Sequence, residues 1–156
     1  MSEAEFRASL ESSIPRHAAI RVEEGRWIEA ESLAASRHEF AQVVPQGRDT
    51  PNRHFCTIVD DGTGSRVGET WYSVVPQGGK AQFWVDWMWI DPEFRRQGYA
   101  TQALRLLETE AERRGADRLG LSVRVANEGA VALYSRLGYA ASNLHLWKML
   151  RPASEP

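Results

Sequence analysis

Apolar residues in the first fifty positions recur at helical spacing. Ser2 and Glu5 fit a capping box that opens a helix with Phe6 and Leu10 on one face, and we expect Pro15 to interrupt it. A second helical pattern ends at 45–47 (Pro-Gln-Gly), and its periodic positions are Trp27, Ala30, Leu33, Ala34, Ala41 and Val44. The chain therefore begins with two predicted helices, followed by a polar loop.

Three strand-like runs occupy the middle of the chain. We expect strands at 54–59, 66–75 and 81–90, with a hairpin turn at 60–64 and a second turn at 76–79. The third run is almost wholly apolar (FWVDWMWI), which predicts a strand covered on both faces, and Asp86 is its exception. Together the runs predict an antiparallel meander.

The last third alternates between helix and strand. A helix is expected to end before Gly115, and its apolar face is Ala100, Ala103, Leu104, Leu107 and Ala111. A strand at 119–125, a short helix from Asn127 to Gly138 and one or two closing strands within 139–150 follow, before a tail at 151–156. The pattern predicts one domain over 1–156, with helices at 1–50 and a core at 54–150. Its fold class is α/β (α+β): a mixed, mostly antiparallel central sheet flanked by helices.

Composition narrows the classes of function. The 156 residues suit one domain, and a formal net charge of -2 argues against nucleic acid as a partner. One cysteine and four scattered histidines form no cluster with metal-ligand spacing, so we expect no metal. The N-terminal segment lacks a long apolar run, so we expect neither a signal peptide nor a membrane span and interpret the chain as cytoplasmic.

The segment 90–101 (IDPEFRRQGYAT) joins the third strand to the next helix. The start of a helix offers unpaired N–H groups and the positive end of its dipole, which suit an anion. Gly98 lets a phosphate approach the backbone, and Arg95 and Arg96 add charge. A plain strand-to-helix turn with solvated arginines would look the same.

A second segment contains Asn127 and Tyr134. Asn127 is first of all a plausible helix N-cap, and Tyr134 follows Leu133 and so falls at the edge of the core as a packed aromatic. Taken together, the two segments resemble the acetyl-CoA-binding motifs of the Gcn5-related N-acetyltransferase superfamily. Residues 95–100 match the loop pattern Arg/Gln-x-x-Gly-x-Gly/Ala, and the downstream pattern is matched by Asn127, Ala130, Leu133, Tyr134, Leu137, Gly138 and Tyr139.

The resemblance implies roles for both segments and covers about residues 54–150. Backbone groups of Met88, Trp89 and Ile90 would pair with the pantetheine arm of acetyl-CoA, and Asn127 would touch the same arm. The amides of Arg96, Gln97, Gly98, Tyr99, Ala100 and Thr101 would hold the pyrophosphate. Tyr134 would lie near the sulfur and protonate the leaving thiolate, because a phenol with a pKa near 10 carries its proton at neutral pH.

Asp86 is the candidate general base for the acceptor amine. A carboxylate in a dry core is costly, so Asp86 should face a cleft or a cation. A salt-bridged structural carboxylate fits equally well. Trp71, Trp84, Trp87 and Trp89 cluster on neighbouring strands, either as packing or as an aromatic-walled acceptor pocket for an aromatic or cationic amine.

The predicted function is transfer of an acetyl group from acetyl-CoA to a primary amine of a small molecule or peptide. The alternatives are a protein lysine or N-terminal acetyltransferase and a non-catalytic acyl-CoA sensor. Relatives that acetylate protein N-termini can carry Glu where this chain has Ser122, which disfavours that substrate. The family usually opens with a strand, whereas this chain begins at a helix; an edge left exposed in this way could support a homodimer.

Overall fold

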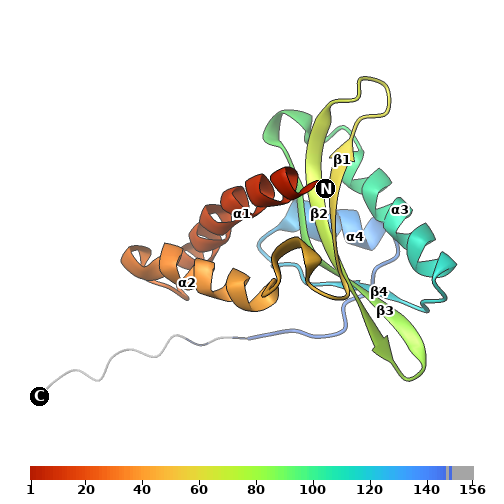
Figure 1. Ribbon diagram of the computed structural model, residues 1–156. Coiled ribbons are helices and arrows are strands. Elements are labelled where there is room, and N and C mark those ends of the chain that lie inside the picture. Colours follow the sequence, from red (N-terminus) through yellow and green to blue (C-terminus); the bar gives the residue numbers. More distant parts are fainter. Residues whose placement is uncertain (147, 149–156) are drawn as a thin grey trace, which may run out of the picture. The chain divides into compact units, whose positions relative to one another are not determined.

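The computed structural model describes residues 1–146 and 148, with only the backbone at Gln77. These residues fall into two compact units, Met1–Ser122 and a second that begins at Val123. The first unit runs in the order α1 (Glu3–Glu23), α2 (Glu29–Val43), β1 (Arg53–Val59), β2 (Arg66–Gln77), β3 (Lys80–Ile90), α3 (Tyr99–Arg113) and β4 (Leu119–Leu121), as Figure 1 shows. Single 3-10 turns at Gly47–Asp49 and Pro92–Phe94 precede β1 and α3.

Helix α1 begins with the predicted capping box. The Ser2 hydroxyl accepts the Glu5 N–H at 3.3 Å, and the Glu5 carboxylate accepts the Ser2 N–H at 2.6 Å. The expected interruption at Pro15 is wrong, because α1 continues to Glu23. An internal proline costs about 3 kcal/mol. Burial of Ile14 before it and of Ala18 after it holds both halves of the helix in place.

Helix α2 lies where it was predicted, but it buries a different face. Leu33 is 50% exposed, whereas Ser32, Ser36 and Phe40 are buried. Ser36 donates its hydroxyl to the Ile14 carbonyl at 2.8 Å, so the two helices pack closely through a satisfied polar side chain. The spacing of apolar residues takes no account of buried serines, and for this reason the sequence indicated the wrong buried face of α2.

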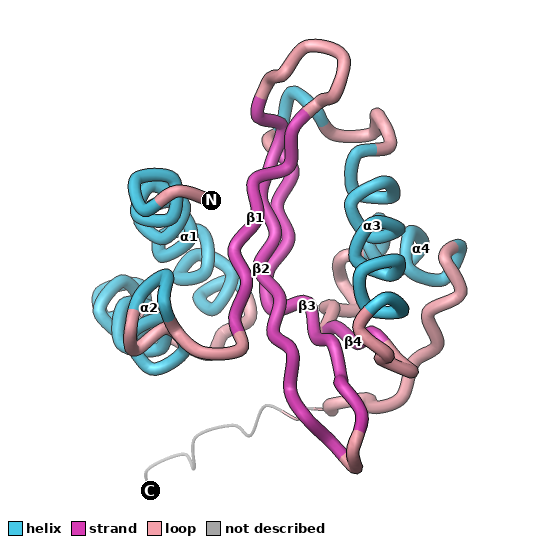
Figure 2. The backbone as a smooth tube through the Cα atoms, turned by 45° about the vertical axis from the view of Figure 1, so that its right-hand side comes forward, coloured by secondary structure: helices cyan, strands magenta, loops and turns pink. Residues whose placement is uncertain are grey.

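The sheet confirms the mixed, mostly antiparallel prediction. Its order is β1-β2-β3-β4, with the first three strands antiparallel and β4 parallel to β3. Helices α1 and α2 lie on one side of β1–β3 and α3 lies on the other (Figure 2). The core on the α1/α2 side is formed by Phe6, Ile14, Phe40, Val44, Phe55 and Trp71.

Strand β3 carries a bulge at Asp86. Trp71 lies opposite Trp87 and Tyr72 lies opposite Val85, so Asp86 is the extra residue, without a partner on β2. A bulge restarts the alternation of side chains along a strand. Because directly paired residues share a face, Phe83, Val85 and Met88 lie on the α3 side. The α1/α2 side receives Trp84, Trp87 and Trp89.

The bulge also limits β4. This strand pairs with β3 only from Phe83–Leu119 to Val85–Leu121, so the predicted strand at 119–125 is too long. A bulged strand bends at the extra residue, and β3 therefore parts from β4 directly after Val85.

Helix α3 confirms its prediction in both ends and face. It buries Ala103, Leu104, Leu107 and Ala111, and Gly115 follows its end at φ +72°. Ala100 is half-buried at the edge of this face.

The second unit contains α4 (Glu128–Arg136). Asn127 is its N-cap and accepts the Ala130 N–H at 3.3 Å, and Gly138 follows its end at φ +90°. Residues 140–146 form no strand, and the rest of the predicted closing strands, apart from Lys148, lies outside the described residues. Among the helices that the structure describes, none combines the length and apolarity that crossing a bilayer requires.

Candidate functional site

The N-terminus of α3 is open. Gly98 is its N-cap at φ +92° and accepts the first helical hydrogen bond, from Gln102 at 3.0 Å. The N–H groups of Tyr99, Ala100 and Thr101 therefore have no carbonyl partner within the helix. A Cβ on Gly98 would have only the Gln102 amide within 4 Å, at 3.8 Å, so there is open space beside the N-cap.

Charge distinguishes α3 from the other helices of the described chain. Helices α1 and α4 each have a side-chain N-cap, and α1, α2 and α4 all carry acidic residues in their first turns. Helix α3 has neither a capping side chain nor an acidic residue there. Among the described residues, neither a capping side chain nor a first-turn carboxylate offsets the positive end of its dipole, which favours the binding of an anion there.

The loop before α3 is held by its own side chains. Arg95 donates from Nε to the Ile90 carbonyl at 3.0 Å, and Gln97 donates to the Glu93 carbonyl at 2.9 Å. Arg96 adopts φ +63°, a left-handed conformation that costs a residue with a Cβ about 1–2 kcal/mol. The Arg95 side chain is thus directed back toward β3, and the backbone of 96–101 forms the open surface.

Tyr99 ties this loop to the first hairpin. Its hydroxyl donates to Asp60 Oδ2 at 2.8 Å, across 39 residues of sequence. Thr63 and Tyr99 hydrogen bonds lower the pKa of Asp60, and the bond to Asp60 in turn raises the pKa of Tyr99. Sequence reasoning gave Tyr99 only a backbone role, because nothing in the local pattern links a turn aspartate to it.

The outer edge of β3 is unpaired from Asp86 to Ile90. Within the described residues β4 pairs only with Phe83 to Val85, so the backbone groups of the next five residues have no strand beside them on that edge. The predicted backbone positions Met88, Trp89 and Ile90 all lie in this stretch. An unpaired edge can accept an extended ligand as an added strand.

Trp89 is fixed by charged neighbours at this edge. Its indole N–H donates to Asp91 at 3.0 Å, and Asp91 also binds Arg66 at 2.7 Å. The guanidinium groups of Arg16 and Arg95 lie over the indole ring, 4.2 and 4.5 Å from its centroid. The end of β3 is therefore held rigidly where the loop begins.

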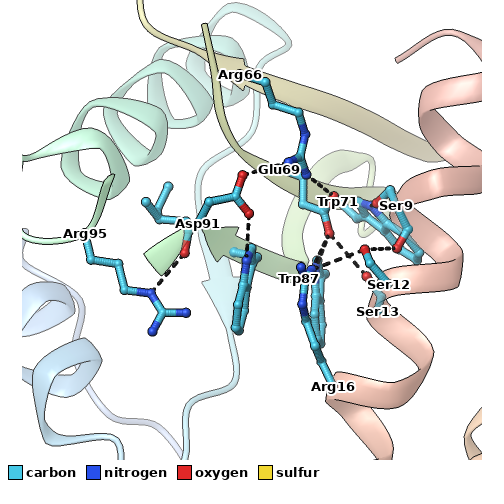
Figure 3. Close-up of polar contacts among 12 residues, drawn as sticks. Ser9, Ser12, Ser13, Arg16, Arg66, Glu69, Trp71, Trp87, Asp91 and Arg95 are labelled. Carbon is cyan, nitrogen blue, oxygen red and sulfur yellow. Dashed lines mark hydrogen bonds and ion pairs between the residues drawn. The ribbon is translucent and has the colours of Figure 1, made fainter. Parts of the chain in front are cut away.

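Glu69 is a fully buried carboxylate that the sequence reasoning missed. Figure 3 shows it at the centre of a polar cluster between α1 and the sheet. It accepts hydrogen bonds from Arg66 at 2.8 Å, Ser13 at 3.2 Å and Trp87 at 3.2 Å, and it lies 3.5 Å from Arg16. Its position inside the strand-like run 66–75 was the available signal, since a charge that becomes buried requires partners.

Asp86 faces a cation, as one of the two sequence alternatives required. Arg53 Nη1 lies 2.9 Å from Asp86 Oδ2, and Ser73 donates to Oδ1 at 3.3 Å. Burial raises the pKa of Asp86, and Arg53 and Ser73 oppose part of that shift. The carboxylate is therefore both ion-paired and more basic than an ordinary aspartate.

The second unit carries the other two predicted side chains. Asn127 uses its side-chain oxygen to cap α4, which confirms the structural interpretation of this residue. Tyr134 is half-buried, its ring centroid lies 5.7 Å from that of Tyr139, and burial raises its pKa. The phenol therefore keeps its proton at neutral pH, as a proton donor must.

The loop, the edge of β3 and Asp86 thus lie within one compact unit, and Asn127 and Tyr134 lie together in the other.

A family model described as the acetyltransferase (GNAT) family matches residues 17–139. The uncharacterized N-acetyltransferase YdgE of Bacillus subtilis is 34% identical over 150 residues, which cover 96% of this chain and 95% of that protein.

Solved structures and a shorter match add to these similarities. The crystal structure of the uncharacterized N-acetyltransferase YycN from Bacillus subtilis matches with a TM-score of 0.90 at 26% identity, covering 97% of this chain and 96% of that one. The ribosomal protein bS18-alanine N-acetyltransferase of Escherichia coli is 44% identical over 50 residues, 32% of this chain and 34% of that protein.

Proposed function

Because the chain belongs to the acetyltransferase (GNAT) family, we propose that it transfers the acetyl group of acetyl-CoA to a primary amine of a small molecule or peptide. One observation carries this proposal: the unpaired edge of β3 is joined by the loop 91–98 to the uncapped N-terminus of α3. A coenzyme A molecule has the two matching parts, a pyrophosphate and an extended amide-bearing arm.

The proposed binding roles follow from these two features. The backbone N–H groups of 96–101 bind the pyrophosphate, and the backbone of Met88 and Ile90 hydrogen-bonds the pantetheine amides in the manner of an added strand. The N–H of Met88 is also a candidate donor to the oxyanion that forms at the thioester carbonyl. Arg95 stabilises the turn itself, because its side chain is engaged with Ile90 and Trp89.

The proposed chemistry is direct transfer in a ternary complex. Asp86 accepts one proton from the acceptor ammonium, and the neutral nitrogen then attacks the thioester carbonyl, so that a C–N bond forms and the C–S bond breaks. Tyr134 donates its proton to the departing sulfur. The second nitrogen proton returns to the phenolate through solvent, and Asp86 releases the first proton to solvent. The reaction therefore balances as an ammonium and acetyl-CoA giving an amide, free CoA and one proton.

The test is a thiol-release assay with acetyl-CoA and a panel of primary amines, run beside calorimetric titration with CoA. We expect CoA to bind at one site per chain and thiol release to depend on an added amine. If the chain binds CoA but none of the amines in the panel causes thiol release, the proposed transfer reaction is contradicted. A chain that does not bind CoA would contradict the proposed site.

A second acceptor class is favoured by one observation. The match to the ribosomal protein bS18-alanine N-acetyltransferase suggests a protein N-terminus as acceptor. Peptides with a free N-terminal alanine therefore belong in the same panel, with their N-formylated forms as controls.

A further inference from the structure

A cavity of about 210 Å³ lies between α1, α2 and the strands of the sheet in the first unit. It is smaller than the roughly 300–1,000 Å³ of sites for drug-sized ligands, so it suits a small molecule. It reaches the bulge of β3, directly beside the edge at which the acyl donor is proposed to bind. Its walls are His17, Arg21, Glu39, Phe40, Val43, Arg53, Trp71, Asp86 and Trp87.

The apolar part of the cavity is aromatic and rigid. Phe40 packs edge-on against Trp71 and Trp87, with ring centroids 5.6 and 6.5 Å apart. The Trp87 indole is held by its hydrogen bond to the buried Glu69 (Figure 3). Of the four clustered tryptophans, Trp71 and Trp87 line this cavity, so it offers a preformed apolar surface.

The charges around the cavity balance. Arg53 pairs with Asp86 at 2.9 Å, and Arg21 lies 3.2 Å from Glu24 and 3.8 Å from Glu39. The cavity lining thus contains two arginines, Arg21 and Arg53, and two carboxylates, Glu39 and Asp86.

His17 completes this wall, where burial favours its neutral form over its charged form. Its Nε2 accepts from Arg21 Nε at 3.0 Å, and Ser36, whose hydroxyl donates to Ile14, accepts from Nδ1 at 3.2 Å. Burial and the nearby Arg21 lower the pKa of His17. A ligand carrying a single charge would therefore place that charge uncompensated in a partly buried, neutral site, whereas a ligand with one charge of each sign would not.

We infer that this cavity binds a free amino acid with an apolar or aromatic side chain, and that the α-amine of this amino acid is the acetyl acceptor. The Arg53–Asp86 pair lies at the cavity wall, with 24% and 19% of the two side chains exposed. A zwitterion can exchange partners with it: the ligand carboxylate binds Arg53 and the ligand ammonium binds Asp86. The side chain then packs on Trp71 and Trp87, and the amine lies beside the bulge.

This inference rests on the proposed function for the transfer step, but its binding part can be measured alone. The probes are leucine, leucinamide and 3-methylbutylamine, which share one side chain and differ in the carboxylate. The fourth probe is a lysine whose α-amine and carboxyl groups are both blocked, so that only its ε-amine can accept an acetyl group. We expect leucine to bind, and to be acetylated, about 10- to 100-fold better than leucinamide or 3-methylbutylamine, the range typical of a charge-assisted hydrogen bond.

Variants locate the carboxylate site. Arg53→Gln should remove the preference for leucine over leucinamide, whereas Arg37→Gln, on the exposed surface of α2 and outside the cavity lining, should keep it. Calorimetry with each probe reports binding even if turnover fails. Binding of leucine without turnover would support the cavity and contradict the proposed reaction.

Two results would overturn the inference and leave the transfer reaction standing. One is equal or better acetylation of leucinamide, the amine or the blocked lysine. The other is a preference for leucine that persists in Arg53→Gln. Failure of all four probes to bind would also overturn it.

Discussion

Trp87 donates its indole N–H to Glu69 at 3.2 Å, so a carboxylate without solvent exposure orients a ring that lines the proposed acceptor cavity. Glu69 is itself held by Arg66 and Arg16, from β2 and α1. The cluster therefore links the position of the first helix to the shape of the cavity.

Glu69→Gln should destabilise the fold by about 1–3 kcal/mol, because the amide cannot balance the charge of Arg16 and makes weaker hydrogen bonds, although Arg66 keeps its pair with Asp91. Urea unfolding monitored by tryptophan fluorescence measures this change. Glu3→Gln, which removes an exposed pair with Arg7, should change stability by less than about 1 kcal/mol. Equal unfolding midpoints for Glu69→Gln and the parent chain would show that the buried pair contributes nothing net.

Gly98→Asp should abolish CoA binding in calorimetry. The substitution places a side chain at φ +92° and a carboxylate where the phosphates are proposed to bind. Gly115→Asp is the matched control, since Gly115 lies at the other end of α3 at φ +72° with no atom within 4 Å of an added Cβ. If both variants lose CoA binding to the same extent, strain rather than the anion site is responsible.

Tyr134→Phe should lower kcat by about 10²-fold and leave the Kd for CoA nearly unchanged, because only the proton donor is removed. Tyr139→Phe, which alters the neighbouring ring, should keep its turnover. Stopped-time thiol release over a range of acceptor concentrations separates kcat from KM. Normal turnover in Tyr134→Phe would exclude this phenol as the acid.

Asp86→Asn should remove the acid limb of the pH–rate profile. Burial raises the pKa of Asp86 above its usual 3.8, so the rate should rise with pH as this carboxylate ionises. The control is Asp61→Asn in the exposed hairpin turn, where the limb should persist. An acid limb unmoved in Asp86→Asn would leave the residue only its structural pairing with Arg53.

Stability should fall as the pH falls below about 6.5, in part because of His17. Burial lowers the pKa of His17 in the folded chain, so the unfolded chain binds its proton first as the pH drops from the ordinary value of 6.5. In His17→Gln the free energy of unfolding should depend less steeply on pH, in the range from pH 7.5 down to the pKa of His17 in the folded parent chain. Denaturant titrations across this range measure the slope, and an unchanged slope would assign the dependence to other groups.

The sequence predicted those features that rest on local chemistry. The capping box at Ser2, the glycines around α3 and the N-cap at Asn127 each depend on residues within one turn, and the structure confirms them. The open helix end was also predicted from neighbouring residues, namely Arg95, Arg96 and Gly98 between the end of a strand and the start of a helix. Its function as an anion site stays a prediction.

Features that depend on distant partners could not be predicted. The buried face of α2 uses serines whose partners lie on α1, and the helix passes Pro15 because packing compensates for the lost hydrogen bond. That the buried carboxylate of Glu69 has charged partners could be recognised only once the structure gave the positions of Arg16 and Arg66. The cation that pairs with Asp86 likewise could be identified as Arg53 only from the structure, and the role of Asp86 as base stays a prediction.

The bulge at Asp86 makes this part of β3 one residue longer than the stretch of β2 that faces it. Loss of one residue there would leave Val85 opposite Tyr72 and Trp87 opposite Trp71, so the side chains from Trp87 to Ile90 would keep their faces. A deletion of one codon is therefore a local event, whereas a deletion of two codons would turn Met88 toward α1 and Trp89 toward α3.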